Sequence, residues 1–566
     1  MSESIAAIQR WGESGRQLEN AVQAYLSSCK ALDIPTFSYP SGTRHLISMI
    51  DDRLYSFDNL LTDRLSSARV SLAHTRNKLA ASILRLPVEI VSRIFSLAID
   101  INIASIDEAH ECSADFVTKI RYHTLHNLLG VCRDWRRIGM SHGALWSLVP
   151  VIRHRDGRLT SLAAQLSFER AGSRLHVVAD FPGAFSRCDI SIFMEDALAR
   201  HGLRINSINF RTAFEGHLTS SLSGLIRATS EAPGSLHELS LCFYRRSISH
   251  ERHTSNRCSL EPCFPEYTGF IRMLESLRVL KLCQVWLPFR DLSLRSLTKL
   301  RLQRLAFGSR AELEVFFRAL SSSSQLRDLE IISVLAAVDR LRVLLPPPSD
   351  FQISLPALDR LYLEDLYPDI LNAVLASITP GGHGVTLNLT SNSYSTPFEA
   401  DPLNILKLVL EGLSFQVDTL MMGCEPADVS FHGILKLMPR VTSLYMDSWT
   451  MHDSRHLLDL ISPADPTSDF PKLTKLHISR TTIPLSGLDD LRNAVASHPI
   501  EELGIGVVVT EIGETEDDYD LQRPLEELDP IRSWLLDTVV PQVVWLPSDK
   551  YSKPSMPEFQ SDVWVL

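Results

Sequence analysis

A short phrase of spaced apolar residues recurs along most of this 566-residue chain and limits the folds that the chain can adopt. The phrase reads apolar, two variable residues, apolar, one variable residue, apolar. Full copies begin at residues 205, 236, 277, 297, 326, 358, 417, 441, 473 and 500, and Leu387 with Leu389 marks a degraded copy. The copies start about 30 residues apart on average, and the segments between many of them place apolar residues three or four apart. Each unit is therefore predicted to be a strand followed by a helix.

A strand with three alternating apolar residues cannot bury that face alone. Parallel strands stacked side by side, with helices outside, share one continuous core. The phrase resembles the strand of long leucine-rich repeats. We therefore expect an α/β fold in which residues 151–510 form an irregular leucine-rich-repeat solenoid, with parallel strands inside and helices outside. Residues 151–204 are expected to supply its first, capping units.

The chain departs from that family three places beyond the last apolar residue of the phrase, where Asn or Cys is usual. Tyr244, Val285 and Leu305 occupy this position, and only Asn392, after the degraded copy, fits. The side-chain ladder that satisfies backbone groups at the turns of regular repeats is therefore expected to be missing. The curvature of the solenoid cannot be predicted from the sequence.

The residues ahead of the repeats predict helices. Residues 1–43 are interpreted as a leader with one short helix, and residues 44–84 as a long amphipathic helix, because no Pro or Gly interrupts them. A seven-residue spacing joins the leucines Leu65, Leu72, Leu79 and Leu86. The seam positions between them are small or polar, which weakens a zipper: Ala68, Thr75 and Ser82. Coiled-coil pairing and folding of the helix onto its own neighbour both remain open.

Two apolar helical stretches follow within residues 85–150. Pro87 suits the first turn of a helix over Val88–Ile99, which is apolar around more than half its girth. A polar segment from 102 to 119 separates it from a second stretch rich in Leu, Val and Trp. So small a unit has more apolar surface than its own core can hide, which predicts a partner.

These residues carry a resemblance to the F-box. The pattern is Leu-Pro, an acidic residue and Ile, then Ile-Phe, then Val-Cys-Arg-x-Trp, then Leu-Trp, and it falls on Leu86, Pro87, Glu89, Ile90, Ile94, Phe95, Leu128, Val131, Cys132, Arg133, Trp135, Leu145 and Trp146. The segment from 100 to 122 is longer than in the common form and is similar to enlarged F-boxes of many fungal proteins. The resemblance covers about 65 residues.

The resemblance implies docking to the small adaptor of SCF ubiquitin ligases, and through it to a cullin. The implied adaptor contacts are Leu86, Pro87, Glu89, Ile90, Ile94, Phe95, Val131, Cys132 and Trp135. The chain would then be a non-catalytic substrate receptor that holds a target protein on the repeats. Neither the target nor the residues that bind it can be identified from the sequence. The alternative is a leucine-rich-repeat scaffold with no role in ubiquitin transfer, whose helices merely cap the repeats.

Charge and composition argue against nucleic-acid binding, membrane association and catalysis. The chain has 56 Lys and Arg against 67 Asp and Glu, a net charge of −11, so nucleic acid is not an expected partner. No segment approaches 18 uncharged apolar residues, and the nine cysteines include no Cys-x-x-Cys pair. We expect no membrane association and a cytoplasmic or nuclear protein with reduced thiols. Phosphate-binding loops and Gly-x-Ser-x-Gly are absent, so no catalytic site and no cofactor are expected.

Three further features have both a functional and a structural interpretation. A loop with His250, His253, Cys258 and Cys263 could hold zinc, although its spacing favours a solvated insertion. Trp286 and Trp449, each soon after a strand, could be binding anchors, but core packing is favoured. Residues 511–566 begin with an acidic run, which is typical of a solvated loop and could attract a basic target, and they end in a segment expected to cap the repeats.

Overall fold

The computed structural model describes most of the chain. The residues outside the description are 1, 33–39, 58–60, 81–82, 84–85, 105–113, 153–160, 173, 182–187, 230–233, 244–257, 261–265, 337–351, 395–401, 412–415, 424–429, 464–468, 512–520, 526–541 and 547–566. The chain divides into two compact units, Met1–Pro87 and Val88–Leu566.

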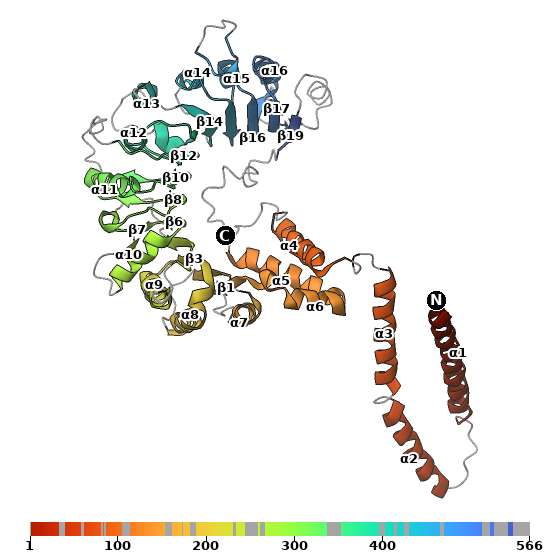
Figure 1. The fold of residues 1–566 in the computed structure, drawn as a ribbon. Coiled ribbons are helices and arrows are strands. Elements are labelled where there is room, and N and C mark those ends of the chain that lie inside the picture. Colours follow the sequence, from red (N-terminus) through yellow and green to blue (C-terminus); the bar gives the residue numbers. More distant parts are fainter. Residues whose placement is uncertain are drawn as a thin grey trace. The chain divides into compact units, whose positions relative to one another are not determined.

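The described part of the first unit is mostly helical. It contains α1 (Ser2–Ala31), α2 (Pro40–Ser56) and α3 (Thr62–Ala80) (Figure 1). The leader helix is therefore longer than expected, with 30 residues. The segment expected to be one helix over 44–84 carries two described helices, and Phe57 and Leu61 on either side of the gap have the wide, i→i+5 helical geometry.

The second unit begins with helices and continues with alternating strands and helices. Its first elements are α4 (Val88–Ala104), α5 (Ala114–Val131), α6 (Arg133–Ser141) and η3 (Gly143–Trp146). The other helices are α7 (Ser161–Arg170), α8 (Cys188–His201), η4 (Gly202–Arg204), α9 (Glu215–Thr229), α10 (Tyr267–Ser276), η6 (Phe289–Asp291), α11 (Arg310–Leu320), α12 (Pro368–Ser377), η7 (Ser391–Tyr394), α13 (Pro402–Glu411), α14 (Phe431–Lys436), α15 (Arg455–Leu460), η8 (Leu485–Gly487) and α16 (Leu488–Ala496).

One large open sheet organises this unit. Its strands are β1 (Leu148–Ile152), β2 (Leu175–Phe181), β3 (Ile205–Thr212), β4 (Glu238–Phe243), β6 (Val279–Cys283), β8 (Lys299–Gln303), β10 (Asp328–Ile332), β12 (Arg360–Glu364), β13 (Gly384–Leu389), β14 (Val417–Met422), β15 (Ser443–Asp447), β16 (Lys475–Pro484), β17 (Glu502–Glu511), β18 (Leu521–Pro524) and β19 (Gln542–Trp545). Each strand from β1 to β17 pairs in parallel with the next in the sheet, and among the described strands only β18 is antiparallel.

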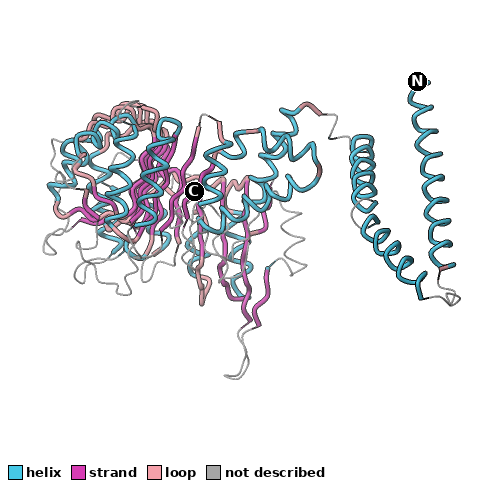
Figure 2. Tube along the Cα trace, turned by 90° about the horizontal axis from the view of Figure 1, so that it is seen from below, coloured by secondary structure: helices cyan, strands magenta, loops and turns pink. Residues whose placement is uncertain are grey.

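Every copy of the apolar phrase lies on or immediately before one of these strands, and the degraded copy forms β13. The helices between the strands lie along one side of the sheet (Figure 2). The prediction of an α/β fold with N-terminal helices and a large parallel sheet is therefore confirmed. Short strands β5 (Cys258–Ser259) and β7 (Val285–Trp286), and β9 (Ala306–Phe307) and β11 (Leu335–Ala336), form two small additional sheets.

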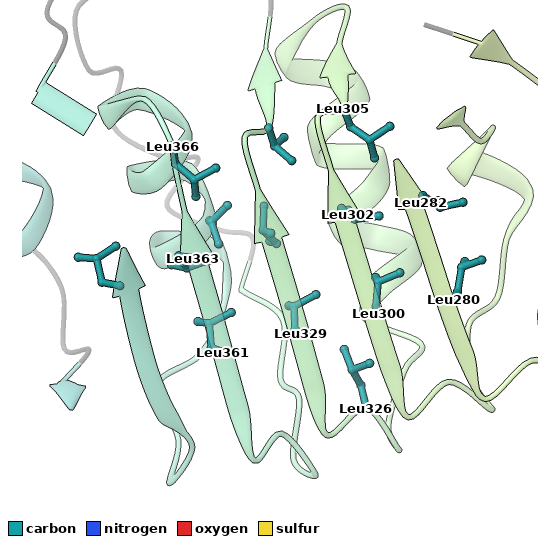
Figure 3. Close-up of a cluster of buried hydrophobic side chains, with 14 of the residues drawn as sticks. Leu280, Leu282, Leu300, Leu302, Leu305, Leu326, Leu329, Leu361, Leu363 and Leu366 are labelled. Carbon is teal, nitrogen blue, oxygen red and sulfur yellow. The ribbon is translucent and has the colours of Figure 1, made fainter. Parts of the chain in front are cut away.

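The core is built from the apolar residues of the phrase. Register places Leu280, Leu300, Leu329 and Leu361 directly beside one another on consecutive strands, and each has no exposed surface (Figure 3). Full burial of one such side chain contributes about 1.5–3 kcal/mol. The same continuous core extends from Val91 in α4 to Leu525.

The turns after β6, β8, β10, β12 and β15, and the register shift within β16, share one backbone feature. Among the described residues, six that are not glycine have a positive φ, and each stands two places after the last apolar residue of its phrase: Gln284, Arg304, Ser333, Asp365, Ser448 and Arg480. Five of them donate their backbone N–H to a carbonyl of the neighbouring strand; Gln284 N, for example, lies 3.0 Å from Gln303 O. Backbone hydrogen bonds therefore cross the turns without the asparagine ladder of regular repeats.

The next position, where Asn or Cys is usual, is filled by buried side chains. Val285, Leu305, Val334, Leu366 and Trp449 occupy it with at most 2% exposure. Asn392, expected to fit the ladder, instead donates its side-chain amide to Asp365, which also accepts from Ser333 and Thr390. Apolar burial replaces the polar ladder over most of the repeats.

The acidic run lies largely outside the described residues, as do the last twenty residues that were expected to cap the repeats. From this region the described part contains β18 and β19, both paired with β17. Gly504 in β17 is required for this arrangement, because a Cβ there would lie 2.8 Å from both the Leu546 side chain and the His477 ring.

The repeated turn can be tested at Gln284, whose φ is 56°. Gln284→Gly is expected to change the free energy of unfolding by less than about 1 kcal/mol, because glycine adopts positive φ without strain. Gln284→Val should lower it by about 2 kcal/mol, since a β-branched side chain is disfavoured there. Urea unfolding measures both, with Ser443→Val in β15 as a control on extended backbone. Equal stability of the two Gln284 variants would contradict the turn geometry.

A buried histidine links the last repeats. His498 Nε2 lies 2.8 Å from Leu460 O, and its Nδ1 accepts from Leu473 N at 3.4 Å. Both bonds together require the neutral ring, with the proton on Nε2. Burial lowers the pKa of His498 below its ordinary 6.5, despite the bond to Leu460.

This geometry predicts acid sensitivity. A lowered folded-state pKa means that the unfolded chain takes up the proton first as the pH falls below about 6.5, so the stabilisation present above that pH is lost. His498→Gln should reduce the drop in melting temperature between pH 7 and pH 5 by about 1–2 °C. His452→Gln, at an exposed position, should leave the drop unchanged. An identical pH profile for wild type and His498→Gln would refute the assignment.

Candidate functional site

Helix α4 has two distinct apolar stripes. Val91, Phe95 and Ile99 are buried, each with at most 1% exposure, and face the core that α4 shares with α5 and α6. Ile90 and Leu97, two turns apart on another side, are 48% and 43% exposed. Water therefore contacts a second stripe that the fold of the chain does not need to bury.

The residues under this exposed stripe hold α6 in place. The rings of Phe95 and Trp135 lie 4.9 Å apart between centroids, and Trp135 is half-buried. Cys132 is the N-cap of α6, and its Sγ accepts from Trp135 N at 3.4 Å. Phe95 was expected to contact a partner, but it has no exposed surface and supports the stripe from below.

The other residues of the motif lie at the surface. Val131, at the end of α5, is 58% exposed, and Ile94 is half-buried. Glu89 is exposed in the first turn of α4, where a carboxylate also stabilises the helix dipole. Leu86 and Pro87 end the first unit and are both exposed, Leu86 by 41%. We name the described residues Val88, Ile90, Leu97 and Val131 the exposed ridge.

Hydrogen bonds connect helix α5, which packs against α4, to the sheet. Tyr122 in α5 donates its hydroxyl to Leu148 O at 3.1 Å and also contacts the hydroxyl of Ser167 in α7. Burial raises the pKa of Tyr122, so this hydroxyl keeps its proton. Trp146 donates Nε1 to Gly139 O at 2.8 Å, and Arg170 lies over its ring. These contacts connect the helices that carry the ridge to β1 and α7.

A second candidate surface lies on the face of the sheet opposite the core. The side chains that alternate with the buried leucines of β8, β10 and β12 are charged and bridge neighbouring strands. Lys299 Nζ lies 2.6 Å from both Asp328 and Glu330, and Arg360 contacts the same two carboxylates. Burial alone would lower the Lys299 pKa, but its hydrogen bonds to Asp328 and Glu330 outweigh it and raise the pKa.

Glu330 is the centre of this network. Its side chain is only 5% exposed and also accepts from Arg301 at 3.3 Å. Sequence reasoning missed the network, although basic, acidic and basic residues alternate at matching phrase positions 299, 328 and 360. This alternation indicates a network only once the register of β8, β10 and β12 shows that the three residues are neighbours.

Farther along, the same face is apolar and covered. Ile332, Tyr362, Met421 and Tyr445 form a buried cluster separate from the main core, and Leu546, directly after β19, packs against it. Charged side chains of this face are partly exposed in β6 to β12, and again at Lys475 and Glu502 in β16 and β17.

The remaining sequence candidates are structural where they are described. Trp449 is fully buried and donates to Met422 O at 3.1 Å, so its interpretation as a binding anchor is wrong. Trp286 is half-buried against Phe289 and Phe307. Burial raises the pKa of the Cys258 thiol to about 12, which is unfavourable for a nucleophile. His250, His253 and Cys263 lie outside the described residues.

Within the described part of the chain, no group of three or more His, Cys, Asp or Glu could hold a metal ion. Among the same residues, no helix has the length and apolar character needed to cross a bilayer. Comparison of the sequence with protein-family models and with curated proteins finds no match.

The charged network makes a stability prediction. Glu330→Gln keeps the shape of the side chain but leaves three cations without their shared partner, and should cost about 2–3 kcal/mol of unfolding free energy. Glu502→Gln is the control, because Glu502 is 30% exposed, and should cost less than about 1 kcal/mol. Urea unfolding at neutral pH measures both. Equal losses of unfolding free energy in the two variants would show that Glu330 is not the centre of a stabilising network.

Proposed function

We propose that this protein is a substrate-recognition subunit of an SCF ubiquitin ligase. The α4–α6 helices, with Leu86 and Pro87 before them, would dock to the adaptor and through it to a cullin. The sheet would hold a target protein. The observation that carries the proposal is the second apolar stripe of α4, because Ile90 and Leu97 stay exposed beside a fully buried stripe.

The position of the exposed residues supports docking over capping. Burial of Leu86, Pro87, Ile90 and Trp135 together against the sheet would favour a scaffold in which the helices only cap the repeats. The first three are exposed, and Trp135 is half-buried. A scaffold nevertheless has its own support, because α5 is bonded to β1 through Tyr122 and the helices share the core of the sheet.

We also propose that the sheet and its outer helices form an irregular leucine-rich-repeat solenoid. Three regularities support this interpretation. Strand order follows chain order from β1 to β17, the phrase leucines stack in register, and the positive-φ residue recurs at one position of the repeat. The target surface is proposed on the charged face of β6 to β12, where polar side chains are accessible.

The contribution of such a receptor to ubiquitin transfer is proximity. Holding the target and the ligase in one assembly converts an encounter between the target lysine and the charged ubiquitin carrier into an intramolecular one. The effective concentration is then of order mM. No side chain of the receptor needs to make or break a bond, so we propose no catalytic residue and no cofactor.

The ridge can be tested with purified adaptor. Replacing Leu86 and Ile90 together by Ala should weaken adaptor binding at least tenfold, because each side chain contributes about 1.5–3 kcal/mol when fully buried at an interface. They are 41% and 48% exposed in the lone chain, so the melting temperature should fall only slightly. Titration of labelled adaptor measures the affinity.

Leu408→Ala is the matched control, since Leu408 in α13 is 65% exposed and lies outside the motif. Equal affinity of the double variant and wild type would rule out docking through Leu86 and the ridge residue Ile90. Absence of any binding by the wild-type chain would favour the scaffold.

A further inference from the structure

The first unit exposes apolar side chains without a core of its own. About two thirds of the exposed large apolar side chains among the described residues precede Val88, and no residue before Val91 is buried in that part of the chain. Most of the stability of a helix in a protein comes from packing its apolar face against another element. The unit therefore needs a partner, and its sequence pattern identifies one.

The apolar seam of α2 and α3 is symmetric about one residue. Leu61 lies at the centre, and seam residues stand 4, 7, 11 and 14 positions away on both sides. They are Ile47, Ile50, Leu54 and Phe57 before it, and Leu65, Ala68, Leu72 and Thr75 after it. Ile47 and Leu54 are 53% and 57% exposed, and Leu72 is 47% exposed. The spacing of the seam residues is therefore the same in both directions from Leu61.

The centre of the seam departs from a plain heptad. Two spacings of four residues meet at Leu61, and a four-residue insertion of this kind locally unwinds a coiled coil. Phe57 and Leu61 have the wide i→i+5 geometry, in which each residue turns the helix less. Residues four apart then stay on one side, so the seam continues from α2 to α3.

Symmetry of this kind suits two antiparallel copies. A two-fold axis at Leu61 places residues equally far before and after it in one layer. The layers pair large with small side chains where the seam looked weak, since Leu54 meets Ala68 and Ile47 meets Thr75. Parallel pairing would instead oppose Ala68 to Ala68 and leave a void.

The charges beside the seam point to the same arrangement. Asp51 stands four places after Ile47, and Arg69 and Arg76 stand four places after Leu65 and Leu72. This flanking position is acidic before Leu61 and basic after it, so antiparallel copies face Asp51 with Arg69 and Arg76 of the second copy. Parallel copies would bring Arg64 toward Arg69.

We propose that two copies of this chain associate through α2 and α3, antiparallel about a two-fold axis at Leu61. Helix α1 adds to the bundle, since its Tyr25 ring already stacks on Phe57 at 6.3 Å and its own apolar side chains, Ile8, Trp11, Leu18 and Val22, are exposed. Two hairpins then form a four-helix bundle. The dimer carries two ridges and two sheets, which permits bivalent binding.

Cysteine cross-linking in the full chain tests the geometry. Leu61→Cys should give a covalent dimer under mild oxidation, because the two copies of residue 61 meet at the axis. Leu54→Cys should stay monomeric on a non-reducing gel, since its partner layer is residue 68, about 21 Å along the helix from residue 54. Adding Ala68→Cys to Leu54→Cys should restore the dimer. The wild-type chain reports any background from native cysteines.

Light scattering of the wild-type chain should give twice the 63.5 kDa mass of one copy. Self-cross-linking of both single variants would indicate a parallel pair and overturn the proposal. A monomeric mass with no cross-linking would also overturn it, and would mean that α1 or another protein covers the seam. These outcomes do not depend on adaptor binding, which the ridge variants test separately.

Discussion

Burial of one strand's leucines by those of the next is the interaction on which the structure depends. Leu280, Leu300, Leu329 and Leu361 line up in register and are each fully buried. A five-residue strand has too few apolar side chains to form a core, so no unit of about 30 residues folds alone. The neighbour must be parallel and in register, because a slip of one residue would turn the leucines to the opposite face.

The turns keep this register without the usual polar ladder. A residue with positive φ directs its N–H to the next strand, and the residue after it enters the core, as Val285 and Leu305 do. Since backbone atoms make the hydrogen bonds, the side chain at the turn can be Gln, Arg, Ser or Asp. The number of residues between consecutive strands can then vary, because the turns after Gln284, Arg304, Ser333, Asp365 and Ser448 rely on backbone atoms.

Apolar surfaces outside the main core differ in whether the fold of the chain covers them. At the amino end, Val91 and Phe95 join α4 to the core, while Ile90 and Leu97 remain on the surface. On the far face of the sheet, by contrast, Leu546 packs against an apolar cluster contributed by β10, β12, β14 and β15. An apolar stripe that the fold leaves open is unfavourable for a lone chain, which is why α4 and the first unit are the regions where we place partners.

Local pattern determined the strands, their buried faces and the α4 helix. These depend on spacings of two and of three to four residues, which any stretch of sequence displays by itself. The same pattern placed Ile90 and Phe95 together in one motif, yet one is exposed and the other buried. It left Trp449 open to two interpretations. The alternation of basic and acidic residues at 299, 328 and 360 did not by itself show that Lys299, Glu330 and Arg360 form one network. Only the tertiary structure decided these points, because they depend on which residues from segments 30 positions apart become neighbours, and that is set by register and packing rather than by local spacing.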